Sequence, residues 1–152
     1  MLIAGIDIGS ITTEALLFDK DSGILGYTIV QTGSDSKKSA ETALEKALSY
    51  PAKKSSDISY VIATGCGRKR ALFAQQSVTE ITCLAKGVNF LFPKARTIID
   101  IGGQDTKAIK IDGKGRVVEF EMNDKCAAGT GRFIEVMAKA LDVELDKIGN
   151  IS

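Results

Sequence analysis

The chain has 152 residues, of which 44% are hydrophobic and 26% are charged, and its net charge is +1. These values are typical of a soluble domain with a hydrophobic core, and the near-neutral charge gives no electrostatic reason to expect binding to nucleic acid or to an anionic membrane. There is no histidine, which excludes a Ser-His catalytic triad and a His-ligated zinc site.

The first elements predicted along the chain are three strands that follow one another as a meander. They cover Leu2–Asp7, Thr12–Phe18 and Ile24–Thr32. The chain begins directly with the first strand, without a basic leader and apolar stretch, and no apolar run reaches the ~20 residues of a membrane span. We therefore expect a cytoplasmic protein without a membrane anchor.

A helix and a fourth strand follow the meander. Asp35 and its serine neighbours are N-cap residues, and apolar residues then recur at helical spacing until Pro51. This apolar face consists of Ala40, Ala43, Leu44, Ala47 and Leu48. Ile58–Ala63 alternates as a strand that runs into a glycine-containing turn, and helices are predicted from about Arg68 and over Glu80–Phe90.

The second half of the chain repeats the first. Ile6-Asp7-Ile8-Gly9-Ser10 returns 93 positions later as Ile99-Asp100-Ile101-Gly102-Gly103. At the same offset, Thr13, Ala15 and Asp19 are matched by Thr106, Ala108 and Asp112. The predicted elements of this half are strands over Thr97–Ile101, Thr106–Ile111 and Arg116–Met122, and a helix over Ala127–Leu141. The repeat predicts a mixed α/β fold with two related subdomains, residues 1–93 and 94–152.

The repeat also predicts where a further strand should lie. At the same offset, the partner of the Ile58–Ala63 strand would begin near Ile151, one residue before the last residue, Ser152. We therefore expect the second subdomain to be incomplete, as in a fragment or a shortened protein.

Each copy of the repeat contains an Asp-x-Gly hairpin. Glycine lets the backbone approach a phosphate, whose oxygens successive N–H groups can hold. The carboxylates beside the glycines, Asp7 and Asp100, can hold a hydrated Mg²⁺ that binds phosphate. An ordinary hairpin turn is the alternative interpretation of a single copy. Two copies in register favour a pair of phosphate loops.

Cys126 lies at the start of the last predicted helix, beside small residues. The N-terminus of a helix stabilises anions and thiolates, so Cys126 is a candidate nucleophile or metal ligand, with a small buried residue as the alternative. The absence of histidine argues against the nucleophile, and thiolates hold iron–sulfur clusters. One cysteine cannot hold a four-iron cluster, so other ligands would have to come from elsewhere.

Four stretches of the chain carry a resemblance to a known family. They are Gly5–Ser10, Ala63–Arg68, Ile98–Lys107 and Asn123–Phe133. The paired hairpins resemble those of the actin-like (ribonuclease H-like) ATPase fold, in which two such hairpins surround ATP. From Met1 to about Val143, the chain resembles the ATP-dependent activators of 2-hydroxyacyl-CoA dehydratases and the related ATPase subunits of benzoyl-CoA reductase.

The resemblance implies an ATPase that transfers electrons. Two identical subunits would share one [4Fe-4S] cluster, with Cys126 as one of the two cysteines that each subunit gives. Binding and hydrolysis of ATP with Mg²⁺ would change the subunit geometry, and the cluster would pass one electron to a dehydratase or reductase partner. The implied first phosphate loop contains Asp7, Gly9, Ser10 and Thr12. The implied second loop contains Asp100, Gly102, Gly103 and Gln104. Gln104 would orient the attacking water, and Gly129 and Gly131 would shape the helix start near the cluster.

The chain departs from the family pattern at several positions. Glu14 stands where a lysine is common, and a charge reversal there would weaken phosphate binding unless the side chain points outward. Cys66 stands where a tyrosine is usual and is expected to be a buried residue at the end of a strand. Cys83 is expected in the core, followed by Leu84 where the family often has His. The second cluster cysteine and the adenosine-binding segment belong to a later part of the family's chain.

Three functions remain open from the sequence. The first is the electron-transferring ATPase activator, or its N-terminal portion. The second is a nucleotide-binding module without cluster or turnover, and the incomplete second subdomain favours it. The third is a small-molecule kinase of the same fold, against which the segment around Cys126 argues.

Overall fold

The computed structural model describes residues 1–123 and 128–150. It consists of two compact units, Met1–Cys83 and Leu84–Ser152, which are described separately. The mixed α/β architecture expected from the sequence is confirmed. The assignment of residues 1–93 and 94–152 to two functional subdomains stays a prediction.

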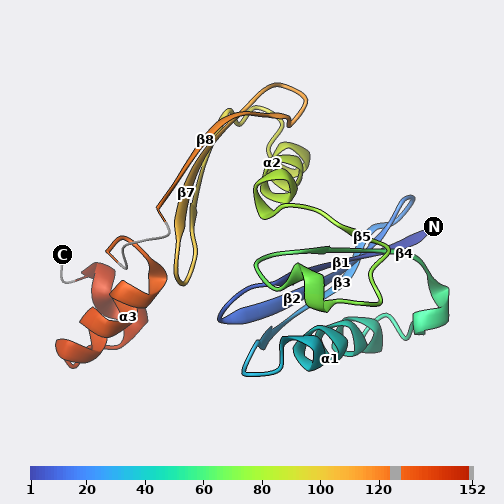
Figure 1. The fold of residues 1–152 in the computed structure, drawn as a ribbon, viewed down its shortest axis with the longest axis horizontal. Coiled ribbons are helices and arrows are strands. Elements are labelled where there is room, and N and C mark those ends of the chain that lie inside the picture. Colours follow the sequence, from blue (N-terminus) through green and yellow to red (C-terminus); the bar gives the residue numbers. More distant parts are fainter. Residues whose placement is uncertain (124–127, 151–152) are drawn as a thin grey trace. The chain divides into compact units, whose positions relative to one another are not determined.

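The first unit contains a five-stranded sheet and one long helix (Figure 1). The strand order is β3-β2-β1-β4-β5. The strands are β1 Leu2–Ile8, β2 Thr12–Asp19, β3 Gly23–Gln31, β4 Ile58–Thr64 and β5 Gln76–Ser77. The meander β1–β2–β3 is antiparallel, whereas β4 pairs with β1 in parallel after the connection through helix α1, Ser36–Ser49.

Alternation along the strands divides this sheet into a buried and an open face. In β1, Leu2, Ala4, Ile6 and Ile8 are buried in the core that α1 covers. The predicted apolar stripe of α1 packs there, and the Oδ1 of Asp35 accepts the N–H of Lys38 at 3.1 Å as its N-cap. Gly5 and Asp7 therefore lie on the opposite face, since successive side chains of a strand alternate.

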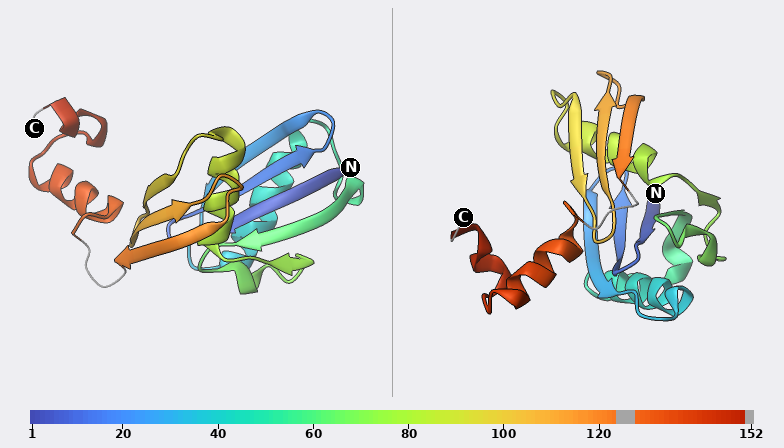
Figure 2. Two further views of the ribbon diagram at one scale, coloured as in Figure 1. Left: turned by 90° about the horizontal axis from the view of Figure 1, so that it is seen from above. Right: turned by 60° about the vertical axis from the view of Figure 1, so that its left-hand side comes forward.

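The second unit contains a three-stranded antiparallel sheet in the order β6-β7-β8 (Figure 2). Its strands are β6 Thr97–Ile101, β7 Thr106–Ile111 and β8 Val117–Asn123. Helix α2, Glu80–Leu91, precedes the sheet and helix α3, Gly131–Ala140, follows it. Short 3₁₀ helices occupy Ser55–Asp57 and Arg68–Arg70 in the first unit and Leu145–Asn150 in the second.

The last predicted helix begins later than expected. Helix α3 starts at Gly131, not at Ala127, and the prediction of its start was wrong. Gly129 has φ of +81° and Thr130 is extended, so neither can belong to a right-handed helix. The apolar side chains of Phe133, Met137 and Leu141 are 43%, 38% and 54% exposed.

The turn after β2 and the turn after β7 also have the same hydrogen-bond pattern. Asp19 Oδ1 accepts the N–H groups of Asp21 and Ser22, and Asp112 Oδ1 accepts those of Lys114 and Arg116. The hydrogen bond from the N-terminal ammonium lowers the pKa of Asp19 to about 2. The hydrogen bonds from Arg116, first from its backbone and then from its side chain, lower the pKa of Asp112 to about 2 as well.

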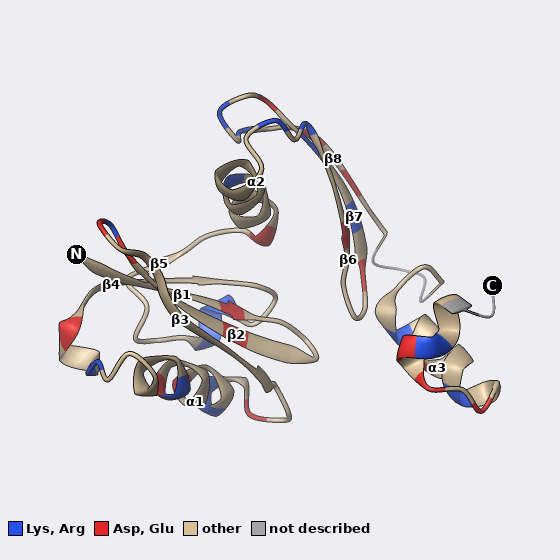
Figure 3. Cartoon of the chain, turned by 180° about the vertical axis from the view of Figure 1, so that it is seen from behind, with Lys and Arg blue, Asp and Glu red and all other residues tan. Residues whose placement is uncertain are grey.

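Acidic and basic residues are mixed along both units, as Figure 3 shows. Among the helices within the described ranges, none combines the length and the apolar character that crossing a membrane requires.

Candidate functional site

The two Asp-x-Gly hairpins form the same turn. The N–H of Gly9 donates to the carbonyl oxygen of Thr12 at 2.9 Å, and the N–H of Gly102 donates to that of Asp105 at 2.8 Å. A Cβ on Gly9 would lie 2.8 Å from the Thr12 oxygen, and one on Gly102 would lie 2.6 Å from Asp105 Oδ1. Both turns therefore have no room for a side chain at the glycine position.

The tips of these turns are open to solvent. Ser10 in the first turn and Gln104 in the second are exposed, while Thr12 and Gly103 are partly buried. Thr32 stabilises the first turn, because its Oγ1 donates to the carbonyl oxygen of Gly9 at 2.9 Å. The residues of the first predicted phosphate loop therefore lie close together in the first unit, and those of the second loop lie close together in the second unit.

The register of the two hairpins is also the same, but one pair of charges differs. Asp7 lies opposite Glu14, and Asp100 lies opposite Lys107. Lys107 is only 2% exposed, and its Nζ lies 3.1 Å from Asp100 Oδ2 and 2.7 Å from Asp105 Oδ1. The second hairpin therefore contains a buried ammonium between two carboxylates, whereas the first has two facing carboxylates.

The loop after β4 packs against the Asp7 carboxylate. Gly65 has φ of +85°, and a Cβ there would lie 2.3 Å from Asp7 Oδ1 and 2.4 Å from the carbonyl oxygen of Ile8. The N–H of Gly67 donates to that same oxygen at 2.9 Å. The Asp7 carboxylate can lie against this loop only because residue 65 has no side chain.

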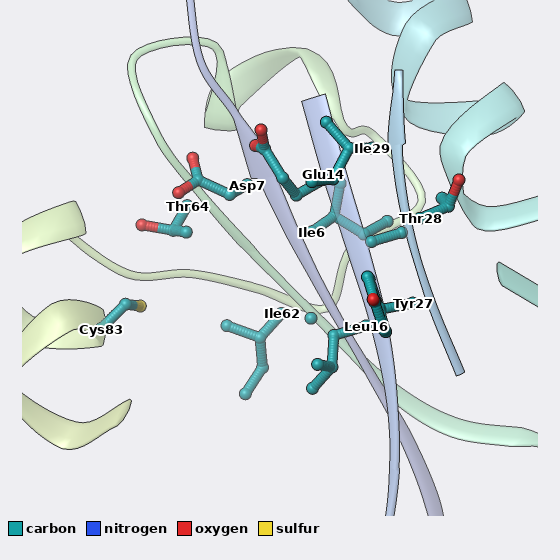
Figure 4. A pocket seen from close by; sticks show the side chains of 12 residues that line it. Ile6, Asp7, Glu14, Leu16, Tyr27, Thr28, Ile29, Ile62, Thr64 and Cys83 are labelled. Atoms are coloured by element: carbon teal, nitrogen blue, oxygen red, sulfur yellow. The ribbon is translucent and has the colours of Figure 1, made fainter. Parts of the chain in front are cut away.

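A cavity of about 330 Å³ opens on this face of the first unit (Figure 4). Asp7, Glu14 and Thr64 are its polar groups at the end of the strands, and apolar side chains continue it along the sheet. The apolar side chains on this face are those of Leu16, Tyr27, Ile29 and Ile62. The Oγ1 of Thr64 is buried and has no hydrogen-bond partner among the described residues.

Helix α3 is attached to the second hairpin turn. The N–H of Gly131 donates to the carbonyl oxygen of Gly102 at 2.9 Å, and that of Arg132 donates to the carbonyl oxygen of Gly103 at 3.2 Å. Thr106 Oγ1 donates to the carbonyl oxygen of Gly129 at 2.7 Å. The start of α3 therefore donates its first two N–H groups to the second hairpin turn.

The three cysteines have different environments. Cys66 is exposed, so the expectation that it is buried was wrong. In the loop after β4, Gly65 and Gly67 pack closely against Ile8 while Cys66 between them is exposed, and its Sγ–H donates to the carbonyl oxygen of Ile8 at 3.5 Å. Cys83 is partly buried. Cys126 lies outside the described residues.

Sequence reasoning missed three parts of this site. Thr64 and Gly65 follow the predicted strand Ile58–Ala63, and only the approach of that strand to β1 gives them a role. Lys107 could have been found from the repeat, since residue 14 plus the offset of 93 gives 107. That comparison would have shown that Glu14 and Lys107 occupy equivalent positions.

Comparison with known proteins gives consistent matches. The chain is 48% identical over 151 residues to the activator of lactoyl-CoA dehydratase of Anaerotignum propionicum, covering 99% of this chain and 58% of the relative. It is 41% identical over 152 residues to the 2-hydroxyisocaproyl-CoA dehydratase activator of Clostridioides difficile, covering 100% of this chain and 57% of the relative. The chain thus spans somewhat more than half the length of these curated relatives.

Solved structures confirm the actin-like ATPase fold. Component A of (R)-2-hydroxyglutaryl-CoA dehydratase from Acidaminococcus fermentans matches with a TM-score of 0.91 at 35% identity, covering 97% of this chain and 56% of that one. The Clostridium difficile activator with bound ADPNP matches with a TM-score of 0.91 at 41% identity, covering 99% and 56%. The sequence profile of the BadF/BadG/BcrA/BcrD ATPase family matches residues 4–152. The resemblance found in the sequence is therefore confirmed, and the chain belongs to the BadF/BadG/BcrA/BcrD ATPase family.

Proposed function

We propose that this chain binds and hydrolyses Mg-ATP as part of an activator that delivers electrons to a 2-hydroxyacyl-CoA dehydratase or to a benzoyl-CoA reductase. The observation that carries the proposal is the pair of identical glycine turns, each beside an aspartate, in a chain 41% identical to an activator solved with ADPNP. A further relative, one of the subunits of the benzoyl-CoA reductase of Thauera aromatica, is 35% identical over 155 residues.

The described residues fit a magnesium nucleotide. The turns have no room for a Cβ at Gly9 or Gly102, and a glycine without a side chain lets a phosphate come close to the backbone N–H groups. Asp7 and Asp100 would hold the water shell of Mg²⁺, because the ion usually keeps several waters. When bound, Mg²⁺ would neutralise part of the negative charge of the phosphate oxygens.

Other residues of the two turns have separate proposed roles. Ser10 and Thr12 would donate hydroxyl hydrogen bonds to phosphate oxygens in the first loop. Gln104 is exposed at the tip of the second turn, where its amide would orient the attacking water. Lys107 would hold the Asp100 carboxylate in position through their 3.1 Å contact.

The attachment of α3 to the second turn offers a path from nucleotide to the Cys126 segment. Gly102 and Gly103 accept the first two N–H groups of α3, so a shift of the turn would move the helix start with it. Residues 124–130 connect β8 to that helix start. We therefore propose that the turn, Gly129 and Gly131 couple the state of the nucleotide to the position of Cys126.

The cysteines of this chain do not complete the proposed cluster. A [4Fe-4S] cluster is held by four thiolates, and a symmetric dimer supplies two from Cys126. Cys66 and Cys83 lie in the first unit and are not proposed as ligands. The homodimer, the cluster and the electron transfer are parts of the proposal.

The nucleotide prediction is tested by Asp7→Ala and Asp100→Ala. We expect each variant to weaken Mg-ATP binding, measured by calorimetry, by about tenfold or more, because each removes a carboxylate from a phosphate loop. Asp21→Ala, in the exposed second turn of the first unit, is the matched control and should bind as the unsubstituted chain does. Unchanged affinity and hydrolysis in both loop variants would contradict the phosphate-loop assignment, and binding without hydrolysis would favour the nucleotide-binding module.

The cluster prediction concerns a protein of the relatives' length. After anaerobic reconstitution we expect Cys126→Ser to lose the stable cluster, measured as iron, sulfide and visible absorption, because a serine oxygen is a poor ligand for iron in such clusters. Cys66→Ser and Cys83→Ser are matched controls that should retain it. Full iron content and an unchanged spectrum in Cys126→Ser would show that the ligand assignment is wrong.

A further inference from the structure

We infer that the outer edge of β3 is a docking site for an extended acidic segment of a partner protein, which pairs with β3 as an additional strand of the sheet. The inference is independent of the proposed nucleotide site. Its support comes from the position of β3 in the sheet, the direction of its backbone groups and the charges of the helix beside it.

β3 is the last strand on one side of the five-stranded sheet, and only β2 pairs with it (Figure 1). From Gly23 to Gln31 it contains neither a charged residue nor a proline. A bulge at Leu25 interrupts the pairing, and Gly26–Gln31 then runs without irregularity along β2. A regular edge strand without charges is a template for pairing with another chain.

The backbone of this run has hydrogen-bonding groups that point away from the sheet. The N–H of Thr32 donates to the carbonyl oxygen of Ile11 at 2.9 Å, which marks a hydrogen-bonded pair of the antiparallel ladder. Such pairs alternate along a ladder, so the N–H and C=O groups of every second residue of β3 point outward, away from β2. These outward residues are Tyr27, Ile29 and Gln31. An added strand would find its main-chain partners there.

The side chains of β3 give the two faces of an added strand different surroundings. Tyr27 and Ile29 are 72% and 62% exposed on the open face. Thr28 and Val30 alternate with them and turn toward α1, which packs against β2 and β3. An added strand would therefore have every second side chain beside apolar groups and the others beside α1.

The side of α1 that lies next to β3 is basic. Lys38 and Thr42 line a cavity of about 250 Å³ together with Val30 and Gln31 of β3. Lys46 lies one turn after Thr42 on the same side of the helix, and both lysines are exposed. The added strand would therefore meet two ammonium groups on the face that it turns toward α1.

Acidic residues of α1 lie on its other side. Glu41 and Glu45 line a different cavity, together with residues of β4. Asp35 also lines the cavity beside β3, but its Oδ1 accepts the N–H of Lys38 as the N-cap. Charge complementarity therefore favours acidic side chains at the positions of the added strand that face α1.

The same charges disfavour a second copy of this chain as the occupant. If β3 paired with its counterpart around a two-fold axis, both copies of α1 would lie on the same face of the joined sheet. Lys38 and Lys46 of one chain would then lie near those of the other, and juxtaposed like charges are unfavourable. A partner segment with alternating acidic and apolar residues fits this edge better.

The direct test is a titration of a fluorescein-labelled peptide, Glu-Val-Glu-Val-Glu-Val-Glu, with the 152-residue chain in the absence of nucleotide, followed by fluorescence anisotropy. We expect saturable binding that weakens with added salt and is about tenfold or more weaker when Lys38→Glu is combined with Lys46→Glu. That double variant should instead bind Lys-Val-Lys-Val-Lys-Val-Lys better than the unsubstituted chain does. Lys94→Glu combined with Lys139→Glu changes the net charge equally at exposed lysines of the second unit, and this matched control should leave both affinities unchanged.

Hydrogen exchange distinguishes strand addition from attraction between surface charges alone. Saturating peptide should slow the exchange of the outward amides of Tyr27, Ile29 and Gln31 but not that of Thr28 and Val30, which already bond to β2. Ile29→Pro removes an outward N–H without removing a bond to β2. It should therefore weaken peptide binding more than Ile29→Ala, which keeps that N–H.

Absence of binding at millimolar peptide, or equal affinity for Glu-Glu-Glu-Glu-Val-Val-Val, would overturn the inference. Unchanged exchange of the three outward amides in the presence of bound peptide would overturn it as well. Protection of these amides that rises with protein concentration, without peptide, would assign the edge to a second copy and also contradict the inference. Because no nucleotide is present, these results do not bear on the proposed ATP site.

Discussion

Gly65→Ala is expected to lower the free energy of unfolding by about 3 kcal/mol or more, one of the largest effects of any single methyl group in this chain. Two causes act together. A φ of +85° is unfavourable for any residue with a Cβ, and that Cβ would lie 2.3 Å from Asp7 Oδ1 and 2.4 Å from the Ile8 carbonyl oxygen. Relief requires movement of the β1 or β4 backbone, because the second of these contacts is to a main-chain atom.

Gly23→Ala separates the two causes. Gly23 has φ of +78°, close to that of Gly65, but no atom lies within 4 Å of a Cβ built there. Its substitution should therefore lower the free energy of unfolding by only about 1–2 kcal/mol, the contribution of the backbone conformation alone. Chemical denaturation of both variants measures the difference. Equal losses would show that the loop after β4 adapts to a side chain and that the position of Asp7 does not depend on it.

The same variant should affect function more than stability alone explains. A shift of the Asp7 carboxylate moves a group that is proposed to hold the water shell of Mg²⁺ in the nucleotide site. Under conditions where Gly65→Ala is still folded, we therefore expect weaker Mg-ATP binding, whereas Gly23→Ala, at the first residue of β3, should bind Mg-ATP normally.

Much of the fold could be predicted because its strands alternate and its hairpins repeat. β1, β2, β6 and β7 begin at the predicted residues, since each is a short run with several apolar residues that is followed by a turn rich in glycine or aspartate. Strand β5 was missed because two residues, Gln76 and Ser77, carry no periodic pattern.

The start of α3 shows why local sequence was insufficient at the site. The Ala-rich stretch before Gly131 is compatible with a helix, but Gly129 adopts a left-handed conformation and its carbonyl oxygen accepts a hydrogen bond from Thr106. That partner is 23 residues away in the sequence. Similarly, Thr64 and Gly65 acquire their roles only through the parallel pairing of β4 with β1, which periodicity does not reveal.

Lys107→Met is the second substitution with a large expected effect. Lys107 is 2% exposed, and methionine nearly conserves its volume while removing the ammonium that lies 3.1 Å from Asp100 and 2.7 Å from Asp105. Removing one member of a buried ion pair leaves the other uncompensated and typically costs about 3–5 kcal/mol. The Asp100 and Asp105 side chains retain 26% and 30% exposure, so water compensates in part and we expect a loss of about 3 kcal/mol.

Two comparisons test that explanation of the Lys107 effect. Lys37→Met removes a lysine from an exposed pair with Glu41, whose charged atoms are 4.0 Å apart, and should cost less than about 1 kcal/mol. Adding Asp105→Asn to Lys107→Met should recover part of the lost stability, because it removes one of the two carboxylates that the ammonium had neutralised, at similar shape. Charge would not be the cause of the Lys107 effect if Asp105→Asn lowered the free energy of unfolding as much in Lys107→Met as it does in the unsubstituted protein. Lys107 would then act through the packing of its carbon chain, and the contrast between Glu14 and Lys107 would lose its electrostatic meaning.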